Sequence, residues 1–185
     1  NDVETDTQKT NSRLYLAPCD NPALGQYFDK TVLTGISEKP ITKLTADIVT
    51  DPVRVWGISE QKGDKYRNMA AGDYVLFYTD DGRYQFAAEI ITIEQNTEVV
   101  GALERIFSSN GNDVKPLERW DYCIYLQAPL EVAIEGENVH GYAGHTINKE
   151  YNFSRLNKRC RKATRQEYWS IESYIQSHQI ENGQN

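Results

Sequence analysis

The stretch Gly72-Asp73-Tyr74-Val75-Leu76-Phe77-Tyr78-Thr79 decides the fold of this chain. Aromatic and branched apolar residues follow a Gly-Asp pair, which is the pattern of a strand that begins at a turn. Asp80-Asp81-Gly82 comes next and predicts a hairpin turn, because these residue types tolerate the backbone angles of tight turns. Residues 84–93 are then expected to form the second strand of the hairpin.

Strands and helices alternate irregularly on either side of this hairpin. Apolar runs that stop at proline or at turn residues predict strands at 14–17, 53–58, 120–126 and 130–134. Helical spacing predicts a helix from Pro22 to about residue 33, a second over 98–107, and a final one after the capping box at 164–167. A short helix is also expected at 65–70. The mixed order predicts an α+β fold whose mixed or antiparallel sheet curls into a small barrel.

Length and composition indicate one globular domain. The chain has 185 residues, of which 39% are hydrophobic and 25% charged, a size that buries a sizeable core without disulfides or metal. We expect the domain to span 13–179, with a flexible tail at 1–12 and a tail or linker at 180–185. No apolar run approaches the roughly 18 residues of a membrane span. The three cysteines lack metal-site spacing, so a cytoplasmic location without cofactors is expected.

The charge of the chain is unevenly distributed. The net charge is −7, yet residues 151–185 hold six basic and only three acidic side chains. A local basic segment on an acidic chain fits a protein that contacts phosphate at one place. The alternative is a solvated charged loop. The predicted phosphate-binding residues are Arg155, Lys158, Arg159, Arg161, Lys162 and Arg165.

Residue patterns of known catalytic sites are sparse. The sequence contains no phosphate-binding loop, dinucleotide-binding glycine motif or nucleophile elbow. His140 and His145 lie among glycines, and nearby acids offer no recognised metal spacing, so a loop role is favoured over a small hydrolase. Cys123 lies inside a predicted strand and is expected to be a core thiol.

Trp56 is the most informative aromatic residue. It stands near the end of a predicted strand and precedes Gly57, where the chain leaves the sheet. A planar ring at such a place can form one wall of a slot that stacks an extruded base. The alternative is a ring packed in the core.

Several of these segments together resemble a known group of domains. The run from Val53 through Trp56 to Ile58, the Gly-Asp-x-Val-Leu-Phe-Tyr element at 72–78, and Ala87-Ala-Glu-Ile90 are similar to the EVE and YTH branches of the PUA-like superfamily. The resemblance is strongest to the N-terminal DNA-reading modules of McrB-type modification-dependent restriction proteins. The segment 118–129 resembles the later core strand of these families, so the resemblance covers about 13–165.

The resemblance implies a fold and a set of base-binding residues. The fold would be a PUA-like (EVE/YTH-like) curled mixed sheet, or small open barrel, flanked by helices. Trp56 would be a wall of the cage around a flipped, methylated base. Trp120 is the preferred second wall, with Tyr122 or Phe107 as alternatives. Asp20, Asn21 and Ser59 would bond the edge of the base, although Asn21 also fits a helix cap.

The same resemblance implies a recognition domain that is not itself an enzyme. Its partner would be DNA carrying a modified base, and it would serve a restriction nuclease or NTPase module in prokaryotic defence. An RNA-binding PUA-like module is the first alternative, since stacking tolerates both sugars. A small hydrolase using His140 and His145, or a domain whose basic segment docks an acidic protein, are the others.

Overall fold

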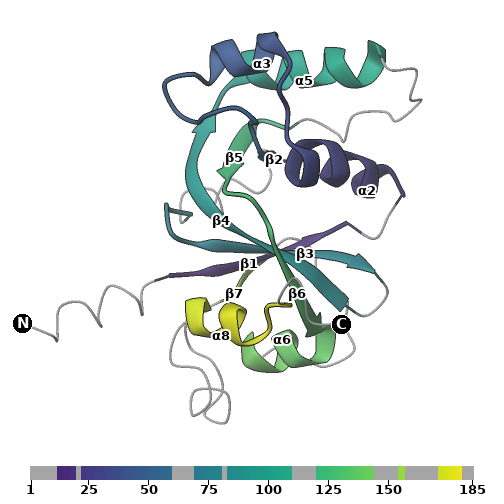
Figure 1. Ribbon diagram of the computed structural model, residues 1–185, viewed down its shortest axis with the longest axis vertical. Coiled ribbons are helices and arrows are strands. Elements are labelled where there is room, and N and C mark those ends of the chain that lie inside the picture. Colours follow the sequence, from purple (N-terminus) through teal and green to yellow (C-terminus); the bar gives the residue numbers. More distant parts are fainter. Residues whose placement is uncertain are drawn as a thin grey trace, which may run out of the picture. The chain divides into compact units, whose positions relative to one another are not determined.

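The computed structural model describes residues 12–19, 22–59, 69–80, 83–109, 120–143, 154–156 and 171–180. The chain divides into two compact units that interleave along the sequence. The first unit takes 1–20, 72–88 and 130–185, and the second takes 21–71 and 89–129. The long strand β4, Arg83–Gln95, contributes residues to both (Figure 1).

The first unit is built on a parallel pair of strands. β1 pairs in parallel with β3, with Leu14 opposite Tyr74, and β7 pairs with β1 in the antiparallel direction. The first part of β4 pairs with β6. Its elements are β1 (Leu14–Pro18), β3 (Tyr74–Asp80), β6 (Leu130–Glu135), α6 (Gly136–Ala143), β7 (Ser154–Leu156) and α8 (Ile171–Ser177).

Apolar residues of α6 and α8 cover the sheet of the first unit. Val139 of α6 and Tyr174 of α8 are fully buried and pack with Leu14, Leu16 and Leu76. Since residues two apart in a strand share a face, Leu14 and Leu16 direct one face of β1 into this core. The Tyr174 hydroxyl also donates a hydrogen bond to Asn138 Oδ1 at 2.5 Å, which joins the two helices.

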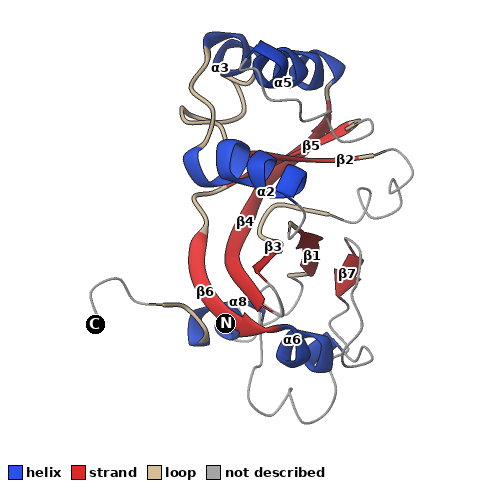
Figure 2. Ribbon diagram, turned by 90° about the vertical axis from the view of Figure 1, so that its right-hand side faces the viewer, coloured by secondary structure: helices blue, strands red, loops and turns tan. Residues whose placement is uncertain are grey.

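The second unit packs helices on an antiparallel group of strands. β2 pairs with β5, and β5 pairs with the second part of β4. The helices α3 and α5 lie side by side (Figures 1 and 2). Its elements are α2 (Pro22–Phe28), the π-helical turn η1 (Asp29–Thr34), α3 (Lys39–Leu44), β2 (Val55–Ile58), α5 (Thr97–Ser109) and β5 (Tyr122–Leu126).

The sheet contains parallel and antiparallel pairs, as the sequence predicts. The strand order is β2-β5-β4-β3-β1-β7, and β6 pairs with β4 outside this path. The register of β4 shifts between Tyr84 and Phe86 and again between Ile90 and Thr92. Such bulges bend a strand and increase its twist, which lets a sheet curl. The predicted α+β class with a curled mixed sheet flanked by helices is therefore confirmed.

Most predicted elements are present, and three elements were not predicted. The hairpin strands, the strands near 14, 55, 122 and 130, and α5 are confirmed, and the first predicted helix is present as α2 continued by η1. The helices α3 and α6 and the short strand β7 were missed. α6 contains two glycines and has low intrinsic helix propensity, but burial of Val139 against the core overrides it. His140 therefore lies in a helix, whereas a loop was expected.

Other predictions fall outside the described residues. These are the short helix at 65–70 apart from its last two residues, the tip of the hairpin, the capping box at 164–167, His145 and both predicted tails beyond Ser12 and Ile180. The domain bounds 13–179 stay a prediction.

Candidate nucleic-acid interface

Five aromatic side chains of the second unit meet in one group, which we call the aromatic cluster. Its members come from α2, β2, α5 and the residue two positions before β5. The closest pair joins α2 to α5, with ring centroids 4.3 Å apart and an interplanar angle of 74°. The cluster consists of Tyr27, Phe28, Trp56, Phe107 and Trp120.

The cluster brings Trp56 and Trp120 into direct contact. Their ring centroids are 5.6 Å apart and their planes are inclined by 52°. Trp120 is equally close to Tyr27, at 5.5 Å and 52°. Phe28 packs on Trp56 in an edge-to-face manner at 6.5 Å. These separations lie within the range of favourable aromatic pairs. The two tryptophans singled out from the sequence are thus neighbours in space.

The loops before β2 place Trp56 in the sheet. Ile36 and Val53 exchange two backbone hydrogen bonds of 2.8 Å just before β2 begins. Gly35 turns the chain toward this pair with φ of +81°, and a side chain there would lie 2.8 Å from Pro52. This position therefore favours glycine.

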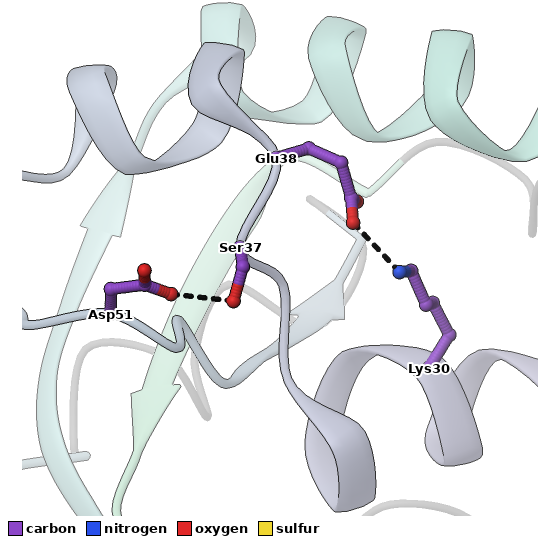
Figure 3. A network of polar contacts seen from close by, with 4 residues as sticks. All are labelled: Lys30, Ser37, Glu38 and Asp51. Atoms are coloured by element: carbon purple, nitrogen blue, oxygen red, sulfur yellow. Dashed lines mark hydrogen bonds and ion pairs between the residues drawn. The ribbon is translucent and has the colours of Figure 1, made fainter.

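Polar contacts hold the same region together (Figure 3). The Ser37 hydroxyl donates to Asp51 Oδ1 at 2.6 Å, and Lys30 Nζ contacts Glu38 Oε1 at 2.9 Å. Arg54 Nε donates to the carbonyl oxygen of Val32 at 3.0 Å, so the residue before β2 is tied to the end of η1. These contacts fix the entry to β2 and hence the position of Trp56.

Trp120 lies directly against the backbone of Gly57. A Cβ atom built on Gly57 would stand 1.9 Å from Trp120 Cδ2 and 2.1 Å from Cγ. Such a distance is a full overlap, so only glycine admits the indole here. Asp121, the residue after Trp120, donates a backbone hydrogen bond of 2.9 Å from its N–H to the carbonyl oxygen of Ile58. β2 and the start of β5 therefore hold the two tryptophans together.

The space between the two tryptophans is filled by the rings themselves. A base sandwiched between two rings needs parallel planes about 6.8 Å apart, twice the 3.4 Å repeat of stacked bases. The observed pair is closer than this and tilted. Trp56 is only 5% exposed. A base can therefore lie between these two tryptophans only after one ring moves.

Of the remaining predicted site residues, some lie near the aromatic cluster, one lies in the first unit, and the others lie outside the described residues. Ser59 follows β2 and is partly exposed, and Tyr122 lies opposite Ile58 at the start of β5, also partly exposed. Both are therefore close in register to Gly57. Arg155 lies in β7, opposite Tyr15 of β1. Asp20, Asn21, Lys158, Arg159, Arg161, Lys162 and Arg165 lie outside the described residues.

A partly buried polar group joins the end of β4 to β5. The Tyr125 hydroxyl donates to Glu94 Oε1 at 2.6 Å, and Asn96 Nδ2 donates to the same oxygen at 3.0 Å. Burial and the hydrogen bond to Glu94 raise the pKa of Tyr125. Burial, with the charge of Glu94, raises the pKa of the Cys123 thiol to about 12. Cys123 is fully buried in the core of the second unit, so its expected role as a core thiol is confirmed.

Two members of the aromatic cluster were not assigned to the site from the sequence. Tyr27 and Phe28 are the buried residues of α2, and no sequence motif marked either one as a base-binding residue. Phe107 was named as an alternative second wall, and it contacts Tyr27. The sequence signal that could have identified them is the pair of adjacent aromatic residues on the buried face of α2.

Within the described ranges, no three His, Cys, Asp or Glu side chains come together to hold a metal ion. None of the described helices combines the length and the apolar character needed to cross a membrane.

Comparison with known proteins identifies the fold. No family model matches the chain, and no curated protein does so. Among solved structures, the N-terminal domain of Thermococcus gammatolerans McrB bound to m5C DNA matches with a TM-score of 0.54 at 13% identity, over 79% of this chain and 91% of that one. The predicted resemblance is therefore confirmed at the level of the fold.

Two YTH domains are also similar to the chain. That of Zygosaccharomyces rouxii MRB1, in complex with N6-methyladenosine RNA, matches with a TM-score of 0.42 at 10% identity, over 79% of each chain. The Pho92 YTH domain, in complex with m6A, matches with a TM-score of 0.46 at 9% identity, over 80% of this chain and 79% of that one.

Proposed function

We propose that this chain is a reader of modified nucleic acid, which takes a flipped, methylated base of DNA into the aromatic cluster at Trp56. The observation that carries the proposal is the meeting of Trp56 and Trp120 over Gly57, on a fold shared with a DNA-bound McrB domain. The role is recognition, and the chemistry belongs to a restriction nuclease or NTPase module in prokaryotic defence.

The energy of base stacking supports this assignment. Extruding a base costs a few kcal/mol, and each aromatic ring that stacks on the base returns about 1 to 3 kcal/mol. A methyl group that the rings shield from water adds about 0.8 kcal/mol to the binding free energy. Discrimination between methylated and plain base is then roughly tenfold to a few hundredfold, if the unmodified base also leaves a polar group unpaired.

The partly exposed residues near Gly57 supply polar contacts to the base. Ser59 carries a hydroxyl and a backbone amide just beyond β2, and Tyr122 starts β5 on the neighbouring strand. Asp20 and Asn21 are proposed for the edge of the base as well. The basic residues of 155–165 hold the flanking phosphates, which gives affinity and salt dependence without sequence information.

Binding to matched duplexes tests the proposal. Four labelled duplexes of one sequence, carrying plain adenine, N6-methyladenine, plain cytosine or 5-methylcytosine, are titrated with the protein and followed by fluorescence anisotropy. We expect one methylated duplex to bind at least several-fold tighter than its plain partner. In Trp56→Ala this preference is lost, because the stacking surface is removed.

The burial of Trp56 calls for a control of folding. Trp56→Phe keeps a ring at this position and is expected to retain part of the preference, while circular dichroism verifies that both variants are folded. Equal affinity of the wild-type protein for all four duplexes would contradict the DNA assignment. The same titration with N6-methyladenosine RNA then tests the RNA alternative, in which contacts to the 2′-hydroxyl discriminate between the sugars.

A further inference from the structure

We propose that the Trp120 indole occupies the base-binding slot in the free protein and leaves it when a base binds. This inference rests on the proposed function and deepens it, since it assigns the place that the base takes. The ligand of the slot is a flat, uncharged heteroaromatic ring no wider than an indole. Trp120 is then a residue displaced by the ligand, and not a second wall of a cage.

The first step of the argument is the glycine under the ring. Gly57 lies inside β2, paired with Cys123 of β5, where a glycine weakens a strand. Glycine within a strand often marks a place where a ligand or another group approaches the backbone closely. A side chain at Gly57 would come within 1.9 Å of Trp120, so a flat ring uses this space.

The second step is the set of surfaces around the indole. Trp56 and Tyr27 contact Trp120 at 5.6 and 5.5 Å, and Phe107 supports Tyr27 at 4.3 Å. Removal of the indole would therefore expose the backbone of Gly57 and ring surfaces of Trp56 and Tyr27. A space bounded by a flat backbone and aromatic rings is suited to a planar, uncharged ring.

The third step is the difference in burial between the rings. Tyr27, Trp56 and Phe107 are 2%, 5% and 5% exposed, whereas Trp120 is partly exposed. Trp120 is thus the ring of this group that reaches solvent, so it can leave by side-chain rotation. The hydrogen bond from Asp121 N–H to Ile58 keeps the backbone of β5 in place during that rotation.

Displacement of Trp120 also explains how a base can bind although the two tryptophans are in contact. The two rings leave no gap for a base between them, because they are tilted and in contact. A base that replaces the indole needs no separation of β2 from β5. The cost of displacement lowers the apparent affinity by the fraction of molecules in which the slot is open.

Two variants and one labelled protein test the inference. Trp120→Ala clears the slot, so we expect the preferred methylated duplex to bind about tenfold tighter, if about one molecule in ten is open in the wild type. A second wall would give the opposite result, because removing a stacking ring weakens binding about 5- to 150-fold. Weaker binding by folded Trp120→Ala would overturn the proposal. Trp120→Phe fills less of the slot and is expected to fall between wild type and Trp120→Ala.

Wild-type protein labelled with 5-fluorotryptophan tests the same inference without changing the packing. The fluorine resonance of Trp120 is assigned by its absence in Trp120→Phe. On addition of the methylated duplex, its solvent isotope shift is expected to rise as the ring leaves the slot, while that of Trp56, which is only 5% exposed, stays small because the base takes the place of the indole against it. If the solvent isotope shift of Trp120 is smaller in the complex than in the free protein, displacement is contradicted.

The slot itself is tested without nucleic acid. Folded Trp120→Ala is expected to bind free indole and to unfold at a higher temperature in its presence, since dry apolar cavities bind matching aromatic molecules. No change in the unfolding temperature would contradict the slot. If no nucleic acid binds any of the proteins, the proposed function fails and the displacement by a base fails with it. If duplexes bind but Trp120 stays protected, only the displacement fails.

Discussion

At position 57 the lack of a side chain decides how the second unit packs. Trp120 lies where the first carbon of any other side chain would stand, and Trp56 and Tyr27 pack on that indole. A residue without ionisable or hydrogen-bonding side-chain groups therefore organises the candidate site. A search of the sequence for catalytic or binding side chains does not detect such a position.

Substitution of Gly57 by alanine is expected to destabilise the protein by about 1 to 3 kcal/mol, the usual cost of overpacking a core. Urea denaturation followed by circular dichroism measures this change. Gly101→Ala is the matched control, because a side chain at Gly101 in α5 would meet only Arg105 Nη1, at an ordinary 3.6 Å. That substitution is expected to be neutral or to stabilise by up to about 1 kcal/mol. Equal stability of Gly57→Ala and wild type would contradict the packing described for Trp120.

The thiol of Cys123 is expected to be unreactive in the folded protein. With its pKa raised to about 12, roughly one thiol in ten thousand is ionised at pH 8. Alkylation with iodoacetamide, mapped by mass spectrometry, should label Cys123 only after denaturation. Rapid labelling of the native protein at this site would show that the thiol is accessible and ionised.

The same shift predicts how stability depends on pH. Because the folded pKa lies above the ordinary value of 9.0, the contribution of Cys123 is complete below pH 9 and is lost as the pH rises toward 12. Urea midpoints measured above pH 9 are expected to fall more steeply in the wild type than in Cys123→Ala, which has no thiol to ionise. Parallel curves for the two proteins would contradict this origin of the pH dependence.

At the scale of elements, α5 packs on the sheet through buried apolar residues, and one polar side chain at its start adds a link to β4. Asn96 Oδ1 accepts hydrogen bonds of 3.1 Å from the N–H groups of Glu98 and Val99, and its Nδ2 donates to Glu94 of β4. The cap therefore connects the helix that carries Phe107 to the strand beside β5. Removal of this cap should loosen the support of Tyr27 in the aromatic cluster.

Replacement of Asn96 by alanine is expected to cost about 1 kcal/mol, the usual value for removal of a helix cap. Chemical denaturation measures the change. Asn96→Ser keeps a side-chain acceptor at the cap position and should retain most of the stability. If the serine and alanine variants are equally unstable, the bond to Glu94 contributes more than the helix cap.

At the scale of the whole molecule, charge and stacking are expected to control different properties of binding. The aromatic cluster belongs to the second unit, whereas Arg155, the described member of the basic segment, lies in β7 of the first unit. Phosphate contacts change the affinity for methylated and plain duplexes alike, whereas contacts with the flipped base also change the preference for the modified base. Variants in the two places are therefore expected to have separable effects.

Lys158→Gln combined with Arg161→Gln is expected to weaken binding to methylated and plain duplexes by the same factor. It should also reduce the slope of log K against log salt by about 0.9 for each phosphate that the protein no longer neutralises. The matched control is Lys39→Gln with Lys43→Gln, which removes the same charge from exposed positions of α3. An equal drop in affinity for the control pair would show that overall charge, and not the basic segment, governs binding.

The sequence by itself determined the strands other than β7, including the two strands of the hairpin, and α5, because their patterns repeat every two or about 3.6 residues and need no distant partner. It also determined that Trp56 stands on a strand beside a glycine. Only the tertiary structure decided that Trp120 fills the space over Gly57, and that Tyr27 and Phe107 join it from α2 and α5. Those contacts join residues far apart in the chain, and burial of Val139 in the core of the first unit made α6 helical despite its glycines. Local periodicity carries no information about which distant side chain will fill a given space.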